Sequence, residues 1–412
     1  MNADLAWLRS VLWGRSEAVR VLFRSGSAEG LEVVERFRIL PRSSRPRILV
    51  PFDNPMACRS GLCQYNDGMT RRSRVAKAVL AQGMRLRPVQ RMFPDQIVVA
   101  TERGRRGELE AALLEHRVRR LMGRHDLQFS ISFGKPRPNR KPVLQALTPE
   151  GAVVGYAKVG WNELTGRLVR NEAAILEALA SRRVHAVQVP RLLFHERWRG
   201  LEISGTTPLP HKLALGAARR DPPVVALRAL IEAFGLSRRR LSDCEYWRQI
   251  RQRIRELATN EPQNSTRRRL ALVADSLNQR RGALSITSGF VHGDWAPWNM
   301  SGFHDRLLIW DWERAALDAP IGLDLVHFAF QVAFHFERRG VRDSILLALR
   351  RTEPYLRLLG VARPTGEILG PLYLLDLAVR HEEAREGATG TGVSTRILDA
   401  LTSTFGPQAG VR

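Results

Sequence analysis

Cysteine, lysine and long apolar runs are all scarce in this chain of 412 residues. Three cysteines are too few for a disulfide framework or for a metal site with four cysteine ligands. No stretch reaches the roughly 18 consecutive apolar residues that cross a bilayer, and the longest candidate, residues 322–336, is interrupted by polar side chains. The N-terminal segment carries arginines among its apolar residues and lacks the apolar core of a secretory signal. We therefore expect no membrane span and a cytoplasmic protein.

The charge of the chain is strongly one-sided. Lys and Arg number 65 against 41 Asp and Glu, which gives a net charge of +24, yet only five of the basic residues are lysines. So strong a preference for arginine is typical of a genome-wide codon bias, which weakens any link between this charge and a binding role. A basic surface attracts nucleotides and nucleic acids, but the arginines are dispersed and no nucleic-acid motif is present. We expect no nucleic-acid partner, and the oligomeric state stays open.

The first part of the chain, residues 1–122, has mixed helical and strand-like patterns and no catalytic motif. Its helical patterns cover residues 4–23, 69–84 and 108–122, and its strand-like runs cover 47–51 and 96–101. We interpret it as an accessory α/β domain of unknown role.

The pattern changes after residue 122. Residues 123–205 contain one helical segment, 168–180, and five strand-like runs, at 129–133, 142–147, 153–159, 190–195 and 200–204. The helix lies between the third and fourth strands, which is the order of a kinase N-lobe. Residues 206–412 are mainly helical, apart from two short apolar runs that flank the richest motif of the chain. This region is therefore expected to form a helical C-lobe.

The segment 291–299, Val-His-Gly-Asp-Trp-Ala-Pro-Trp-Asn, carries the strongest chemical signal. Phosphoryl transfer needs a carboxylate that receives the proton of the acceptor hydroxyl, and oxygen ligands that hold magnesium against the phosphates. Protein kinases place these as an Asp, an Asn after four intervening residues, and a second Asp near a strand end. Here Asp294 and Asn299 have that spacing, and Asp311 follows a turn and an apolar strand. The turn is expected to bring Asp311 back beside Asn299.

At these positions the sequence resembles the aminoglycoside phosphotransferase and choline kinase-like family, over about residues 127–385. The resemblance implies an α+β, bilobal, protein kinase-like fold with a five-stranded N-lobe and a mainly helical C-lobe, here with an extra N-terminal α/β unit. It implies that Asp294 is the catalytic base and that Asn299 and Asp311 bind Mg²⁺. It also implies that His292 braces the catalytic loop and that Asp324 supports this loop structurally.

An independent check lies upstream of the motif. A kinase needs a Lys on its third strand to hold the α- and β-phosphates and a Glu on the next helix to position it. Lys158 lies in the third predicted strand, and Glu172 lies in the following helical segment. A Lys that points inward from an apolar strand is costly unless it is paired, so we expect an ion pair between the two. The loop from Gly134 to Arg140 contains Lys135, a candidate for covering the phosphates.

These features predict a phosphotransferase that moves the γ-phosphate of ATP or GTP to a hydroxyl of a sugar, aminosugar, amino alcohol or aminoglycoside. Two alternatives differ in class. A pseudokinase or nucleotide-binding regulatory module would lack one catalytic residue, and none is missing. A basic nucleic-acid-binding protein would need a clustered basic face, which the dispersed arginines do not indicate.

Overall fold

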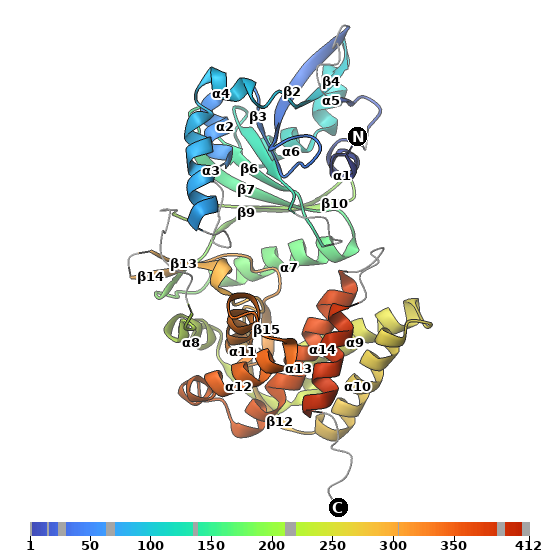
Figure 1. Ribbon diagram of the computed structural model, residues 1–412, viewed down its shortest axis with the longest axis vertical. Helices are drawn as coiled ribbons and strands as arrows, with labels where there is room; N and C mark the ends of the chain where they lie inside the picture. Colours follow the sequence, from blue (N-terminus) through green and yellow to red (C-terminus); the bar gives the residue numbers. More distant parts are fainter. Residues whose placement is uncertain are drawn as a thin grey trace, which may run out of the picture. The chain divides into compact units, whose positions relative to one another are not determined.

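The computed structural model describes residues 2–14, 16–23, 30–62, 71–134, 139–210, 220–303, 305–384 and 392–405, and Figure 1 shows its ribbon. The chain forms two compact units. We call the first the sheet unit; it comprises Met1–Pro136, Arg140–Ala173 and Pro190–Leu215. We call the second the helical unit; it comprises Arg137–Asn139, Ala174–Val189 and Gly216–Arg412. Strands and helices are thus largely segregated, and the predicted α+β class is confirmed.

The sheet unit is built on one nine-stranded sheet in the order β1-β4-β2-β3-β5-β6-β7-β10-β9. All neighbouring strands are antiparallel. The strands are β1 Arg20–Phe23, β2 Leu31–Leu40, β3 Ile48–Pro51, β4 Gln96–Glu102, β5 Gln128–Ser132, β6 Val143–Leu147, β7 Val153–Gly160, β9 Leu192–Trp198 and β10 Leu201–Thr206. The last five, with helix α7 (Glu163–Ala180) after β7, confirm the strand and helix order predicted for the kinase-like part.

The first four strands extend this same sheet, so the boundary predicted at residue 122 does not separate two sheets. Ile48 and Leu49 of β3 pair with Ser132 and Ile131 of β5. β3 lies between β2 and β5 inside the sheet, and all of its residues are buried. Local patterns give the strands of a sheet but not the partners of each strand, which is why the sequence suggested a separate unit.

Helices cover both faces of the N-terminal part of the sheet (Figure 1). The helices are α1 Ala3–Leu12, α2 Pro55–Leu62, α3 Arg71–Gly83, α4 Arg87–Arg91, α5 Arg106–Ala112 and α6 Leu114–Leu121. Successive strand residues point to opposite faces: Phe37 and Ile39 join the core shared with α1, α5 and α6, whereas Leu40, Ile48 and Val50 join the core shared with α2 and α3.

Two predicted helices of this part were wrong in extent. The helix predicted over residues 4–23 ends at Leu12, and residues 20–23 form β1. The helix predicted over residues 108–122 is divided at Leu113, whose backbone is extended (φ −83°, ψ 130°). Residues 31–40, which form β2, were not predicted as a strand.

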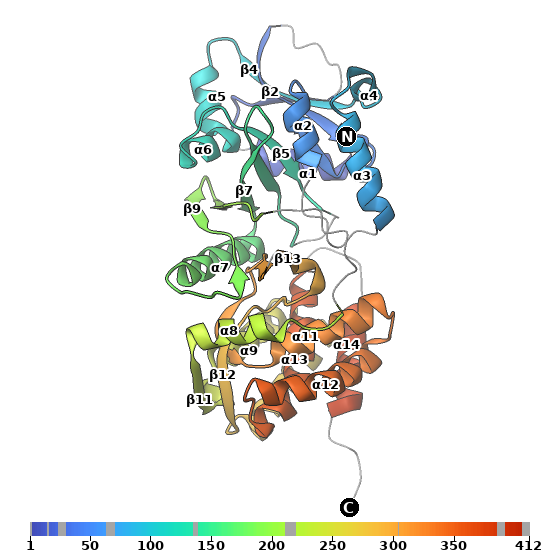
Figure 2. The same cartoon turned by 90° about the vertical axis from the view of Figure 1, so that its left-hand side faces the viewer.

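In the helical unit five helices, α9 to α12 and α14, pack against α13, most of whose residues are buried (Figures 1 and 2). Its helices are α8 Val224–Phe234, α9 Glu245–Asn260, α10 Ser265–Arg281, α11 Leu323–Gln331, α12 Val341–Leu358, α13 Arg363–Glu383 and α14 Val393–Phe405. Two three-stranded sheets accompany them: β11 Leu236–Arg240, β12 Ser285–Val291 and β15 Ala316–Pro320 in one, β8 Val187–Gln188, β13 Met300–Phe303 and β14 Arg306–Ile309 in the other. A π-helical turn, Val332–Phe336, continues α11.

Two smaller expectations concern cysteines and membranes. Cys58 and Cys244 are buried and form no disulfide, and Cys63 lies outside the described residues. No helix in the described ranges is both long enough and apolar enough to span a bilayer.

Candidate active site

The two halves of the sequence motif meet in the helical unit because a β-hairpin connects them. Strand β12 ends at Val291, and the motif residues follow in a loop and one 3₁₀ turn, Pro297–Asn299. Strands β13 and β14 then pair, with Met300 opposite Ile309. The Trp310 N–H donates to the Asn299 carbonyl at 3.1 Å, one residue before Asp311. The predicted return of the chain toward Asn299 is therefore present.

Both carboxylate oxygens of Asp294 are held by side chains. Asn299 Nδ2 donates to Asp294 Oδ2 at 2.8 Å and to the Asp294 carbonyl oxygen at 3.0 Å. His327 Nε2 lies 2.9 Å from Asp294 Oδ1. The Asp294 side chain is one quarter exposed. A carboxylate has about four acceptor positions, so these bonds leave room for one more donor, such as a hydroxyl.

The surroundings of Asp294 favour its ionised form. Burial alone would raise the pKa of Asp294, but the hydrogen bond from His327 and the positive charge of Arg380 hold this pKa below its ordinary value. The carboxylate is therefore ionised at neutral pH and can only accept hydrogen bonds. It follows that His327 Nε2 carries a hydrogen.

Asp324 fixes the backbone of the same loop from α11. Its two carboxylate oxygens accept the N–H groups of His292 at 2.7 Å and Gly293 at 2.8 Å, and its side chain is almost fully buried. It lies in the first turn of the helix, where the helix dipole favours a negative charge. Asp324 thus supports the loop by accepting hydrogen bonds from two successive loop amides with one carboxylate.

His292 joins the two halves of the motif. Its Nδ1 accepts the Asp294 N–H at 3.2 Å, and its Nε2 lies 3.2 Å from the Trp310 carbonyl oxygen. Because one ring nitrogen accepts while the other faces an acceptor, the ring is the neutral Nε2–H tautomer. Burial lowers the pKa of His292, which also favours this neutral form. The ring thus connects the backbone of Asp294 to that of Trp310.

Two backbone positions in the motif lie in the left-handed region. Gly293 has φ +76°, and a Cβ at this position would overlap the Arg314 carbonyl oxygen, so only glycine fits. Asp311 has φ +68° although it carries a side chain. Backbone strain of this kind concentrates at functional sites, where the surrounding structure enforces it.

A buried ion network lies beside the loop. Arg380 Nη1 donates to the Gly293 carbonyl oxygen at 2.7 Å, and Arg380 also pairs with Asp376. Arg253 bonds Glu383 with two nitrogens, at 2.7 and 2.8 Å, and lies 3.5 Å from Asp376. Burial would raise the pKa of Asp376, but the charges of Arg380 and Arg253 lower it to about 2. The negative charges of these carboxylates are therefore balanced by arginines of the same chain.

The predicted ion pair of the sheet unit is present. Lys158 on β7 places its Nζ 2.8 Å from Glu172 on α7. Glu172 is almost fully buried, whereas the Lys158 side chain is 22% exposed. The third candidate in this part, Lys135, lies outside the described residues.

The donor set of the motif suits magnesium, which prefers oxygen ligands and keeps several from water and phosphates. Both hydrogens of the Asn299 amide are used on Asp294, so its Oδ1 is the atom left for a ligand. Asp311 adds a carboxylate immediately after the hairpin. Over the described ranges, no group of three or more His, Cys, Asp or Glu side chains is placed to hold a metal ion. The fit therefore rests on one amide and one carboxylate, with phosphate oxygens as further ligands.

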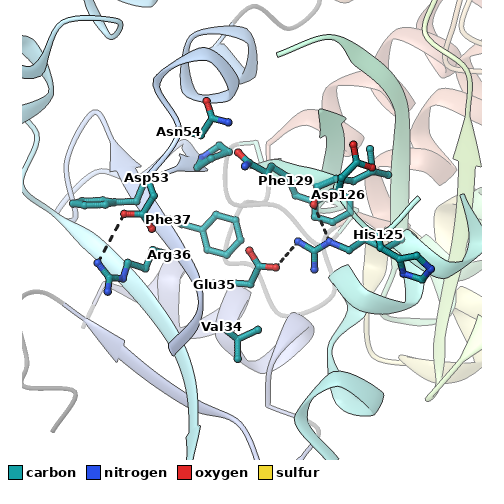
Figure 3. A pocket seen from close by; sticks show the side chains of 14 residues that line it. Val34, Glu35, Arg36, Phe37, Asp53, Asn54, His125, Asp126 and Phe129 are labelled. Carbon is teal, nitrogen blue, oxygen red and sulfur yellow. Dashed lines mark hydrogen bonds and ion pairs between the residues drawn. The ribbon is translucent and has the colours of Figure 1, made fainter. Parts of the chain in front are cut away.

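A pocket of about 300 Å³ lies in the sheet unit, where β3 and β5 diverge after their short pairing (Figure 3). Its charged walls are paired within the chain. Glu35 pairs with Arg119, and Arg36 lies 3.8 Å from Asp53. Asp126, a third carboxylate of the lining, pairs with Arg124 at 2.7 Å. We assign no ligand to this pocket because each of its carboxylates is paired with an arginine of the chain.

Two neighbours of the proposed base were not predicted from the sequence. Arg380 had no local signal, since arginine is common throughout the chain. His327 had one: it lies three residues after Asp324 on a helix, a spacing that places both side chains on one face.

This chain was compared with protein-family models, with curated proteins and with solved structures. No family model and no curated protein matches it, whereas several solved structures do. The choline kinase LicA from Streptococcus pneumoniae has a TM-score of 0.45 and 14% identity over 70% of this chain and 99% of its own. A thermostable mutant of the aminoglycoside phosphotransferase APH(4)-Ia, solved with ADP and hygromycin B, has a TM-score of 0.43 and 14% identity over 72% and 99%. The amicoumacin kinase hAmiN has a TM-score of 0.44 and 11% identity over 66% and 86%.

Proposed function

We propose that the chain is a small-molecule kinase similar to the aminoglycoside phosphotransferases and choline kinases. It would transfer the γ-phosphate of ATP or GTP to a hydroxyl of a sugar, aminosugar, amino alcohol or aminoglycoside. The observation that carries the proposal is the state of Asp294, an ionised carboxylate with both oxygens fixed and room for one further donor. Asn299 is bonded to Asp294, and Asp311 follows the hairpin that begins at Asn299. These two side chains would supply the oxygen donors that a phosphotransferase needs.

In this mechanism Asp294 accepts a hydrogen bond from the acceptor hydroxyl and takes its proton as the hydroxyl oxygen bonds to the γ-phosphorus. The bond from the γ-phosphorus to the bridging oxygen breaks, and the nucleoside diphosphate leaves. Mg²⁺ held by Asn299 and Asp311 would neutralise charge on the phosphates. Lys158, positioned by Glu172, would hold the α- and β-phosphates. His292 and Asp324 keep the loop in the conformation that presents Asp294.

Magnesium-dependent nucleotide binding tests the proposal. ATP and GTP are each titrated with and without Mg²⁺, and stability is followed by thermal unfolding of the wild type, Asp311→Asn and Asp305→Asn. Asp305 is the matched control because it is an exposed aspartate in the turn of the same hairpin. A ligand at 100 times its Kd adds about 2.7 kcal/mol to the free energy of unfolding. We expect this gain with Mg²⁺ in the wild type and in Asp305→Asn, and its loss in Asp311→Asn. Absence of stabilisation by either nucleotide contradicts an active kinase.

A further inference from the structure

One of the two side chains that hold the Asp294 carboxylate comes from outside the motif. Asn299 belongs to the loop, and its amide oxygen is also a proposed metal ligand. His327 belongs to α11, and its Nε2 lies 2.9 Å from Asp294 Oδ1. The residue His327 is only 4% exposed, so the contact is shielded from water. Hydrogen bonds to a charged group are stronger than neutral ones, so the contact is well suited to orient the carboxylate.

The position of His327 is fixed from two sides. Asp324, one turn earlier on α11, binds the loop through two backbone N–H groups. This contact ties the helix to the loop, so the distance from His327 to Asp294 does not depend on a flexible segment. The edge of the His327 ring meets the ring of Tyr373 of α13, with centroids 5.6 Å apart and an interplanar angle of 73°. The imidazole is therefore held in one orientation by packing.

We propose that His327 is a positioning residue for phosphoryl transfer. Its Nε2–H holds Asp294 Oδ1 while Asn299 holds Oδ2, so the carboxylate keeps one rotamer and aims a lone pair of fixed direction at the acceptor hydroxyl. The inference rests on the proposed function, since it names the residue that orients the base of that reaction. A misplacement of about 1 Å at a reacting group can cost about 100-fold in rate, which is the effect at stake.

Two substitutions separate positioning from general packing. His327→Gln keeps an N–H donor near the place of Nε2, whereas His327→Phe keeps a ring of similar size against Tyr373 and removes the donor. The matched control is His335→Phe, the same substitution in the π-helical turn that continues α11, where the ring touches Trp298 by its edge. Turnover is measured with Mg²⁺ and nucleotide on an acceptor panel that includes water, together with thermal unfolding of each variant.

The expected result is a fall of kcat by about 100-fold in His327→Phe, with an unchanged KM for the nucleotide. His327→Gln is expected to recover to within about tenfold of the wild type, and His335→Phe to match it. Wild-type kcat in His327→Phe, or equal losses in the Gln and Phe variants, overturns the inference while the proposed function stands. A wild type that transfers phosphate to no acceptor and not to water overturns both.

A second measurement covers the case in which His327→Phe does not fold. ¹⁵N NMR of the imidazole nitrogens reports which ring nitrogen carries hydrogen and whether it donates. We expect a protonated, hydrogen-bonded Nε2 in the wild type and a clear change of this signal in Asp294→Ala, but none in Asp305→Asn. An Nε2 signal that is unaltered by Asp294→Ala contradicts the inference.

Discussion

Glu115 is the buried carboxyl whose removal gives the most specific prediction for stability. Its residue is fully buried on α6, and its Oε1 accepts the Trp13 indole N–H at 2.9 Å. Burial raises the pKa of Glu115 from 4.5 to about 7, and the nearby charge of Glu35 adds to the rise. In the unfolded chain the carboxyl returns to its ordinary pKa. Between these two values the folded state therefore binds the proton that the unfolded state releases.

The sign and size of the effect follow from linkage. The contribution of Glu115 to stability is fully present below pH 4.5, where the carboxyl is protonated in both states. This contribution is lost as the pH rises through about 7. The pKa difference of about 2.5 units corresponds to about 3 kcal/mol at about 1.36 kcal/mol per unit. Glu115→Gln keeps an oxygen for Trp13 and cannot ionise, so it removes this loss. The free energy of unfolding of the variant, relative to that of the wild type, is therefore expected to increase as the pH rises.

The assay is urea unfolding of the wild type and Glu115→Gln at several values between pH 5 and pH 8, followed by circular dichroism. The difference between the two proteins is the quantity of interest, because the titration of histidines contributes equally to both and cancels. Glu108→Gln is the control, since Glu108 is an exposed glutamate of the preceding helix, α5. We expect the difference to grow by about 2 to 3 kcal/mol across this range for Glu115→Gln and to stay constant for Glu108→Gln. Parallel curves for Glu115→Gln refute the reasoning.

Two further predictions concern the proposed site. Glu172→Gln removes the charge that positions Lys158, so nucleotide affinity is expected to fall about tenfold by calorimetry, and wild-type affinity would argue against this role for the pair. Asp324→Asn leaves one of the two loop amides without an acceptor, since an amide side chain offers one oxygen. The His292 and Gly293 amides are then expected to exchange hydrogen faster while the core of α13 does not, and unchanged exchange would show that the clamp is dispensable.

The sequence predicted the local arrangement of the loop better than its surroundings. The spacing of Asp294, Asn299 and Asp311 is local, and a short hairpin is enough to bring the motif halves together. The contact between Lys158 and Glu172 was also predictable, because strand and helix periodicity place both side chains on known faces. These cases share a short sequence separation between the elements involved.

Contacts between distant segments were not predictable in the same way. The Arg380 contact with the Gly293 carbonyl joins residues 87 positions apart, and nothing in either segment marks the pairing. The addition of β1–β4 to the sheet depends on β3 pairing with β5, which no local pattern encodes. The early end of α1 and the strand β1 show the same limit, since residues 20–23 become a strand by pairing with β4. Tertiary pairing overrides local preference at such places.

The most direct test of the proposed function is transfer of radiolabelled γ-phosphate from ATP or GTP to a panel of sugars, aminosugars, amino alcohols and aminoglycosides. We expect Mg²⁺-dependent transfer by the wild type to at least one acceptor. Asp294→Asn is expected to lower kcat by about 100-fold or more, because a general base typically contributes this much, while Asp305→Asn matches the wild type. Transfer by Asp294→Asn at the wild-type rate, or none by the wild type to any acceptor, would contradict the assignment of Asp294 as the base of a kinase.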